Sequence, residues 1–126
     1  MRYRTHSATG ALKNGGTAAW NRKNGEPMNS CTTCKEAIEH CMSTHTFAFA
    51  HLYGDEKIMD MHIHNCCEVY YSISGGKQFL IDHCLYDIRP GDLFLINQFE
   101  SHHLTQIDQQ THERIILSID PEYLSK

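Results

Sequence analysis

Three histidines and one glutamate have the residue types and the spacing of a metal-binding site. His62, His64 and Glu68 are separated by even numbers of residues in one predicted extended segment. Because side chains alternate along a strand, these three share a face, with His62 and His64 about 7 Å apart. His102 begins a later predicted strand and could complete the set from across the fold. Three imidazoles and a carboxylate suit a divalent transition metal such as Zn, Fe, Mn or Ni.

Two other residues share the parity of these candidate ligands. Tyr70 could offer its hydroxyl to a bound molecule, although a half-buried strand tyrosine is the commoner case. Cys66 could be a soft metal ligand or a redox-sensitive thiol, although a small buried thiol is commoner. The three histidines could likewise be ordinary structural residues, so the pattern alone leaves these alternatives open.

The segments that must position these residues have the alternating pattern of β-strands. Val, Ile, Phe and Tyr side chains are frequent in them, and turn residues separate them, with Gly75-Gly76 read as a hairpin, Asp82-His83 as a turn and Pro90-Gly91 as another. Short strands at this spacing, with no helices between them, favour an antiparallel sandwich or barrel, of which the jelly roll is one solution. The predicted strands are 47–53, 68–74, 78–81, 85–88, 93–96, 102–107 and 114–119.

A short helix is predicted within residues 31–45. Thr33 and Glu36 have capping-box spacing, and one apolar face follows at helical period, formed by Cys34, Ala37, Ile38, Cys41 and Met42. An alternative zinc site would use Cys31, Cys34, Cys41 and His45. The helix disfavours it, because Cys34 and Cys41 would lie two turns apart, about 10 Å.

Composition limits the remaining possibilities. At 126 residues the chain has the length of one domain, and its net charge of −4 argues against nucleic-acid binding by the folded part alone. It has no apolar run of roughly 18 residues that could span a membrane. Six cysteines without an export signal indicate free thiols and a cytoplasmic location.

Residues 1–30 differ from the rest of the chain. This segment is rich in Gly and Asn, and before Glu26 it carries basic but no acidic side chains. Such a composition cannot bury enough apolar area to offset the entropy of ordering, so we predict a disordered basic tail. The tail could also contact DNA phosphates, or translation could start at Met28.

The motifs quoted next resemble those of a known superfamily. The first, His62-x-His64-x₃-Glu68-x₆-Gly75, is similar to the first cupin motif, and Gly91-x₅-Asn97-x-Phe99-x₂-His102-x₃-Gln106 is similar to the second. The second motif departs from the cupin pattern at Asn97, Phe99 and Gln106, where proline, glycine and asparagine are usual. A more specific resemblance, over 47–124, is to the amino-terminal sensing domain of AraC-type transcription regulators. It rests on His62-Ile63-His64, Glu68-Val69-Tyr70-Tyr71, Ser74-Gly75, Tyr86-Asp87-Ile88-Arg89-Pro90-Gly91-Asp92-Leu93, Glu100-Ser101-His102 and Asp120-Pro121-Glu122-Tyr123-Leu124.

This resemblance implies a mainly β, cupin-like (RmlC-like) antiparallel jelly-roll barrel over 46–124, with the short helix in front of it. It also implies that a small effector binds in the interior. Since many such sensors use no metal, a metal-free polar pocket becomes a further alternative. The residues expected to bind the effector are His62, His64, Glu68, Tyr70 and His102, of which all but Tyr70 are the candidate metal ligands; no catalytic residue is assigned.

The family resemblance also sets expectations for partners. In the family, a dimerisation segment and two helix-turn-helix units follow this domain, and neither follows Lys126. We therefore expect a fragment that regulates transcription, contacting DNA only through a region absent from this chain, and a full-length protein that could be a homodimer. The alternative is a stand-alone metal-dependent cupin enzyme of the dioxygenase or isomerase type.

Overall fold

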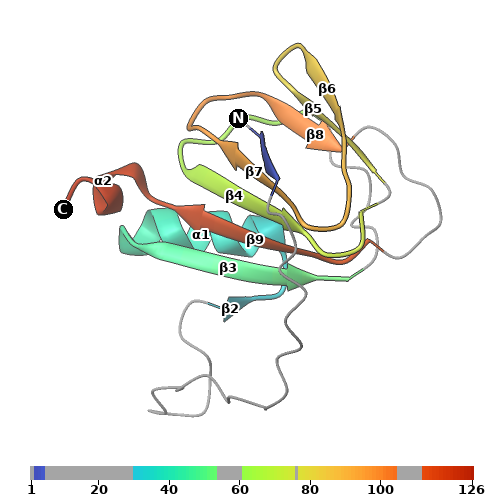
Figure 1. The fold of residues 1–126 in the computed structure, drawn as a ribbon. Helices are drawn as coiled ribbons and strands as arrows, with labels where there is room; N and C mark the ends of the chain where they lie inside the picture. Colours follow the sequence, from blue (N-terminus) through green and yellow to red (C-terminus); the bar gives the residue numbers. More distant parts are fainter. Residues whose placement is uncertain (1, 5–29, 54–60, 76, 105–111) are drawn as a thin grey trace.

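Two facing β-sheets form the body of the protein (Figure 1). The computed structural model describes residues 2–4, 30–53, 61–75, 77–104 and 112–126. The larger sheet has the strand order β1-β7-β4-β9-β3-β2 and the smaller one β6-β5-β8. The strands are β1 (Arg2–Arg4), β2 (Ser30–Cys31), β3 (Phe47–Leu52), β4 (Cys67–Ser72), β5 (Gln78–Ile81), β6 (Cys84–Asp87), β7 (Asp92–Ile96), β8 (His102–Leu104) and β9 (Arg114–Ile119). The helices are α1 (Cys34–Thr44) and α2 (Pro121–Leu124).

The predicted mainly β class is confirmed, and β5 and β9 have the predicted bounds. The prediction of the strand at 102–107 is met as far as Leu104, and 105–107 lie outside the described residues. Neighbouring strands are antiparallel except β2 and β3, which pair in parallel. No helix in the described ranges is long and apolar enough to cross a membrane.

The predicted hairpin at Gly75-Gly76 is wrong. The strand before it, β4, pairs with β7 and β9, whereas the strand after it, β5, pairs with β6 and β8 in the other sheet. Gly75 has a φ of 71° and turns the chain out of the larger sheet, while Gly76 lies outside the described residues. The tight hairpin is at Asp82-His83, between the paired residues Ile81 and Cys84.

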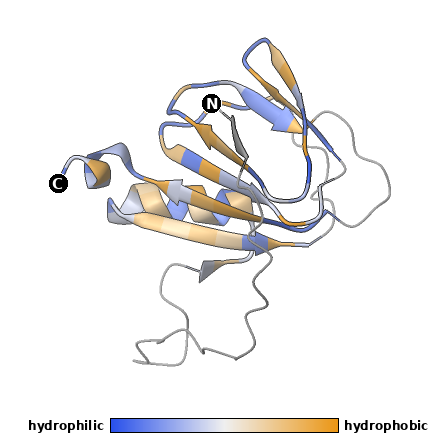
Figure 2. Cartoon of the chain, in the orientation of Figure 1, coloured by the Kyte–Doolittle hydropathy of each residue, from blue (hydrophilic) through white to orange (hydrophobic). Residues whose placement is uncertain are grey.

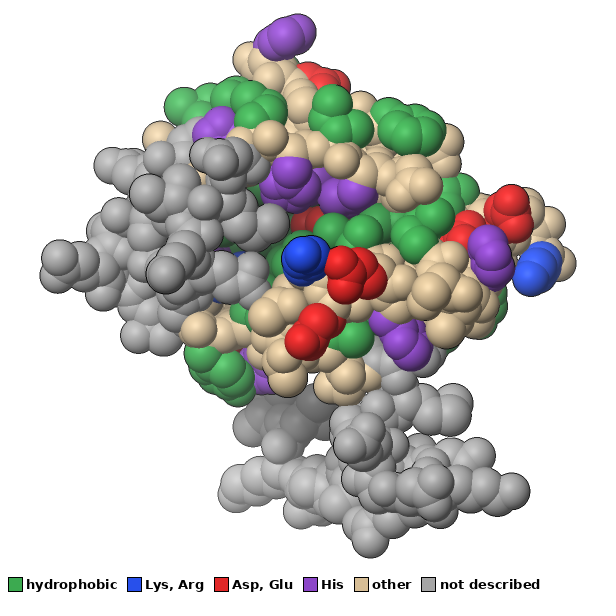
Figure 3. All heavy atoms as spheres, turned by 180° about the vertical axis from the view of Figure 1, so that it is seen from behind, with side chains coloured by type: hydrophobic (Ala, Val, Ile, Leu, Met, Phe, Trp, Pro, Cys, Tyr) green, Lys and Arg blue, Asp and Glu red, His purple; other side chains and the backbone are tan. Residues whose placement is uncertain are grey.

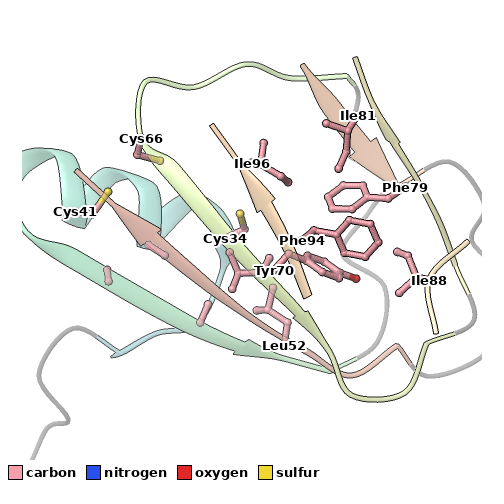
Figure 4. Packing of buried hydrophobic residues seen from close by; sticks show 14 residues of the cluster. Cys34, Cys41, Leu52, Cys66, Tyr70, Phe79, Ile81, Ile88, Phe94 and Ile96 are labelled. Atoms are coloured by element: carbon pink, nitrogen blue, oxygen red, sulfur yellow. The ribbon is translucent and has the colours of Figure 1, made fainter. Parts of the chain in front are cut away.

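The core lies between the sheets and beneath helix α1, because alternate side chains of β3, β4, β5, β7 and β9 are buried there with residues of the helix. The rings of Tyr70, Phe79 and Phe94 gather there, with centroids 4.9 Å apart for Tyr70 and Phe79 and 5.4 Å for Phe79 and Phe94 (Figure 4). Such separations suit tilted and edge-to-face aromatic packing. Figure 2 shows hydrophobic colours along most of β3, whereas β8, which carries His102 and His103, is largely hydrophilic. A polar strand therefore borders an apolar core.

Helix α1 begins where the sequence predicts. Thr33 is its N-cap, and the Thr33 side chain accepts a hydrogen bond from Glu36 N–H at 3.1 Å. The Glu36 carboxylate accepts from Thr32, one residue earlier than a standard capping box would place it. Cys34 and Cys41 are buried in the core on the face of α1 that packs against β3 and β9, so they take the structural positions that the helical pattern favours.

Two short pieces of the predicted disordered tail are strands in the structure. Arg2–Arg4 form β1 beside β7, with Arg2 opposite Phe94, and Ser30 begins β2. Strand pairing uses backbone groups, so a polar segment can extend a sheet edge without burying apolar side chains. The rest of the tail, 5–29, lies outside the described residues.

Candidate metal and ligand site

The four candidate ligands come from both sheets. Glu68 points inward from β4, His62 and His64 precede that strand, and His102 is the first residue of β8. His62 N–H donates to the His102 carbonyl at 3.3 Å, and His102 N–H donates to the His62 carbonyl at 3.2 Å. This pair of backbone bonds holds a residue of the smaller sheet against the segment that enters the larger one.

The side chains of these four residues converge, and we call them the His/Glu cluster. His64 Nε2 lies 3.2 Å and His102 Nε2 3.7 Å from Glu68 Oε2. One ring nitrogen from each of the three histidines lies within 4.8 Å of the others. The side chains of His64, Glu68 and His102 are 7%, 3% and 1% exposed. Figure 3 shows histidine side chains next to one another on one face of the molecule, with an acidic side chain recessed below them.

Backbone carbonyls determine which nitrogens face the middle of the cluster. His64 Nδ1 lies 3.0 Å from the Cys66 carbonyl, and His102 Nδ1 lies 2.9 Å from the Glu100 carbonyl. Because a carbonyl only accepts, both Nδ1 atoms carry hydrogen, and in the neutral tautomer each Nε2 is left with a lone pair. Metal-binding histidines have this same outer arrangement.

Two imidazole lone pairs facing a carboxylate need a proton or a cation between them. The buried His102 Nε2 has no hydrogen-bond partner of normal length in the described part of the chain. The donor set of the cluster, three imidazoles and one carboxylate, also suits a divalent transition metal. The His102 Nε2 atom without a hydrogen-bond partner and the types of donor present both indicate that His62, His64, Glu68 and His102 fit a metal ion.

Without a metal, the contacts within the cluster shift the pKa values of Glu68 and His102 in opposite directions. Burial alone would raise the pKa of Glu68, but the nearby imidazoles of His102 and His64, through their contacts with the carboxylate and their charges, lower it to about 2. For His102, burial would lower the pKa, and its contacts with Glu68 and the Glu100 carbonyl raise it above the usual value. Both shifts come from one interaction, in which an ionised Glu68 favours the protonated form of His102.

A cavity of about 20 Å³ adjoins the cluster. Space of this size holds one or two water molecules. Five residues were predicted to bind the effector. All of them except His64 line this cavity, namely His62, Glu68, Tyr70 and His102. The remaining lining residues are Cys34, Phe79, His103, Leu104, Arg114 and Ile116.

The hydroxyl of Tyr70 is held by a histidine that the sequence analysis did not single out. His112 Nδ1 lies 3.0 Å from the Gly75 carbonyl, so it carries hydrogen, and His112 Nε2 accepts the hydrogen bond of the Tyr70 hydroxyl. Burial raises the pKa of Tyr70 further than the nearby Arg114 lowers it. The phenol therefore stays neutral, and its oxygen lone pairs remain for a ligand.

Arg114 could have been found from the alternation of β9, and His112 from its even spacing before that strand. Arg114 shares the parity of the buried Ile116 and Ser118, which places it on the inner face of β9, and the buried His112 lies two residues before that strand. Cys66 is buried with its sulfur 3.2 Å from His64 Nδ1, outside the cavity lining. Among the described residues, a second group that could bind a metal is His45, Asp120 and Glu122, where Asp120 already serves as the N-cap of α2.

Fold and site together define a cupin-like jelly roll, so the predicted fold is confirmed. An RmlC-like cupin from Shewanella frigidimarina is similar, with a TM-score of 0.53 and 16% identity over 65% of this chain and 73% of that one. A predicted oxalate decarboxylase from Thermotoga maritima has a TM-score of 0.53 and 22% identity over 64% and 72%. Because the sequence identities to these two proteins are only 16% and 22%, the similarity supports a shared fold and says nothing about a shared function. The chain spans 59% of the plu4264 protein from Photorhabdus luminescens, which has 23% identity over 64% of this chain and a TM-score of 0.45.

Residues 45–126 match the family model of the AraC-like ligand binding domain. The chain belongs to this family. None of the curated proteins compared with the chain matches it.

Proposed function

We propose that the chain is the effector-sensing domain of an AraC-type transcription regulator of the cytoplasm. The observation that carries the proposal is the family match over 45–126, together with a cluster of buried polar groups at an interior cavity of that domain. A small molecule bound there would act on transcription through a DNA-binding region outside this chain, within a full-length homodimer. It can shift the regulator between conformations only if it binds one of them more tightly.

The metal ligands in this proposal are His62, His64, Glu68 and His102, holding Zn, Fe, Mn or Ni. When bound, the ion would supply a Lewis-acid centre and open coordination positions for the effector. The protein's own residues orient the ligands and contact the effector. The Cys66 and Glu100 carbonyls orient the imidazoles of His64 and His102, and Tyr70 presents a phenol oxygen to the same cavity.

Elemental analysis tests the metal ligands. Protein purified without added metal, and protein reconstituted with each of the four metals, is expected to hold about one equivalent of a preferred ion. His64→Ala should lose most of it, whereas His83→Ala, an exposed turn residue, should keep it. A wild-type protein that holds no metal after reconstitution would contradict the metal-bound form of the proposal and leave a metal-free pocket.

A second candidate is a stand-alone metal-dependent cupin enzyme, of the dioxygenase or isomerase type. The observation that favours it is the donor set itself, which resembles a catalytic site with open positions. The reading frame that follows the Lys126 codon separates the two candidates. A continuing helix-turn-helix coding region supports the regulator, whereas an immediate stop followed by an unrelated gene supports the enzyme.

A further inference from the structure

The larger sheet is apolar on the face that turns away from the core. We call this the outer sheet face, and it consists of the odd-numbered residues of β3, β4, β7 and β9. Apart from His51 and Cys67, their side chains are all aliphatic or aromatic. Helix α1 packs against the opposite face of β3 and β9 (Figure 1), and the core cluster of the described residues contains no residue of the outer sheet face.

The polar side chains of these four strands point the other way. The inner face carries five buried polar residues, namely Glu68, Ser72, Asp92, Arg114 and Ser118. An antiparallel sheet with one face on the core and one face in water has the opposite alternation, with apolar side chains inside and polar side chains outside. The outer sheet face therefore has the composition of a surface that another apolar surface covers.

Strand register joins the outer side chains into continuous rows. Leu117 in β9 lies opposite both Phe49 in β3 and Val69 in β4. Val69 in turn lies opposite Leu95 in β7. Side chains opposite one another have Cβ atoms only ~5 Å apart, so each row forms one apolar surface. Tyr71 and Leu95 on this face are each 37% exposed. A contiguous apolar patch that remains accessible to solvent is typical of an interaction site.

The charges of the chain favour a second copy of it as the partner. With a net charge of −4, two copies repel each other wherever acidic surfaces meet. The outer sheet face contains no Asp, Glu, Lys or Arg. At its margin, the Glu113 carboxylate lies 2.9 Å from His51 Nε2, which offsets its charge. A highly charged partner would select a face of opposite charge, whereas an uncharged face is complementary to an identical one.

The size of the outer sheet face meets what a dimer needs. Four strands about 4.8 Å apart and up to about 20 Å long cover roughly 400 Å² in projection. Two such faces together bury about 800 Å², and the relief of their side chains raises this to the ~1,000 Å² that a specific interface should clear. At one end of the face, the ring of Tyr123 in α2 lies 5.7 Å from that of Phe47, so apolar packing on this face is already present within one chain.

We propose that two copies of the chain bind each other through the outer sheet face, packed sheet against sheet. The two sheets of a β-sandwich pack in this way, about 10 Å apart with interdigitated side chains. A two-fold axis brings the same patch of both copies into contact. This contact needs no effector, metal ion or DNA-binding region, so it goes beyond the proposed function. Its modest area predicts a micromolar dissociation constant.

Analytical ultracentrifugation of the full, metal-free and reduced chain tests for the dimer. The wild type is expected to change from monomer to dimer between about 1 and about 200 µM. Tyr71→Glu places a charge in the outer sheet face and should raise the dissociation constant at least about tenfold. Leu85→Glu is the matched control, since Leu85 is 56% exposed on β6 of the smaller sheet, and should leave the constant unchanged. A wild type that remains monomeric at ~200 µM, or a folded Tyr71→Glu that dimerises equally well, would overturn the proposal.

Two cysteines of the wild-type chain locate the interface without any substitution. Cys67 is half-buried in the outer sheet face, whereas Cys84 is exposed on β6. As the protein concentration rises and the dimer forms, alkylation by iodoacetamide should slow severalfold at Cys67 and stay constant at Cys84, as read by peptide mass spectrometry. A dimer that leaves the ratio of the two rates unchanged uses another surface and refutes the proposal. If Tyr71→Glu does not fold, this ratio decides.

These measurements are independent of the tests of the proposed function. Neither the dimer nor the alkylation of Cys67 involves an effector or a metal ion. A chain that loads metal but stays monomeric contradicts the dimer alone, and a chain that dimerises without loading metal contradicts only the metal-bound sensor.

Discussion

Replacing Glu68 by glutamine removes the buried charge of the His/Glu cluster while keeping the shape of the side chain. The contacts with His102 and His64 outweigh burial and lower the pKa of Glu68 from 4.5 to about 2. That difference corresponds to ~3 kcal/mol of preference for the ionised form. The new amide can donate a hydrogen bond to one imidazole and recover ~1 kcal/mol. We expect Glu68→Gln to lower the free energy of unfolding of the metal-free protein by ~2 kcal/mol near neutral pH.

The pH dependence of this difference has a defined sign. Because the pKa of Glu68 is lower in the folded protein than in the unfolded chain, its stabilisation is present above about pH 4.5 and is lost as the pH falls towards 2. The raised pKa of His102 acts in the opposite direction, so its contribution is present below pH 6.5 and is lost as the pH rises through the higher folded value. The stabilisation from these two groups in the metal-free wild type should therefore be greatest above about pH 4.5 and below the raised pKa of His102.

Urea denaturation in the presence of a chelator measures these effects. The difference between wild type and Glu68→Gln should be largest at about pH 5–6 and should shrink below pH 4.5. Glu39→Gln, an exposed helix residue, is the matched control and should change little. If Glu68→Gln is as stable as wild type at about pH 6, or if the difference grows at lower pH, the assignment of an ionised Glu68 is refuted.

Three further substitutions test the fold. Thr33→Ala should cost ~1 kcal/mol in urea denaturation, because the cap of α1 is lost, and no change would contradict the capping role. Phe94→Ala, in the centre of the ring cluster, should cost ~3–5 kcal/mol in the same assay, and a cost below ~1 kcal/mol would contradict its core position. Gly75→Ala should lower the melting temperature, because its Cβ would lie 2.7 Å from Pro90 Cδ at a φ of 71°, and an unchanged melting temperature would refute this close approach.

The strand pattern could be predicted because the longer strands β3, β4, β5, β7 and β9 each have one buried face. Alternation fixes which residues point inward, and β9 at Arg114–Ile119 has both predicted bounds. Pairing is harder to predict, as the Gly75 turn shows. Two adjacent strands joined by glycine look like a hairpin in the sequence, and the choice of sheet depends on packing with distant segments. Strand β1 could not be predicted for a related reason. It pairs with β7 through backbone groups, which every sequence has, so its side chains carry no signal of the pairing.

The candidate ligands were accessible to sequence analysis because parity placed His62, His64 and Glu68 on one face. Their convergence with His102 depends on a contact between segments about forty residues apart, which the cupin resemblance suggested and the backbone bridge provides. Arg114 was not singled out, since it belongs to a strand with no motif. Its place in the cavity follows from the register of β9 with β4.

The backbone bridge between His62 and His102 gives the site a consequence for local stability. A ligand held by residues on both sides of that bridge binds only while the two segments stay together. It therefore raises the free energy of opening the barrel at this edge, by ~2.7 kcal/mol at a concentration one hundred times its dissociation constant. The amide hydrogens of His62 and His102 should then exchange with solvent about a hundredfold more slowly. Ligand binding in the interior would thus make this edge of the barrel more rigid. A neighbouring part of a larger protein that packs against the edge could respond to that change without touching the ligand.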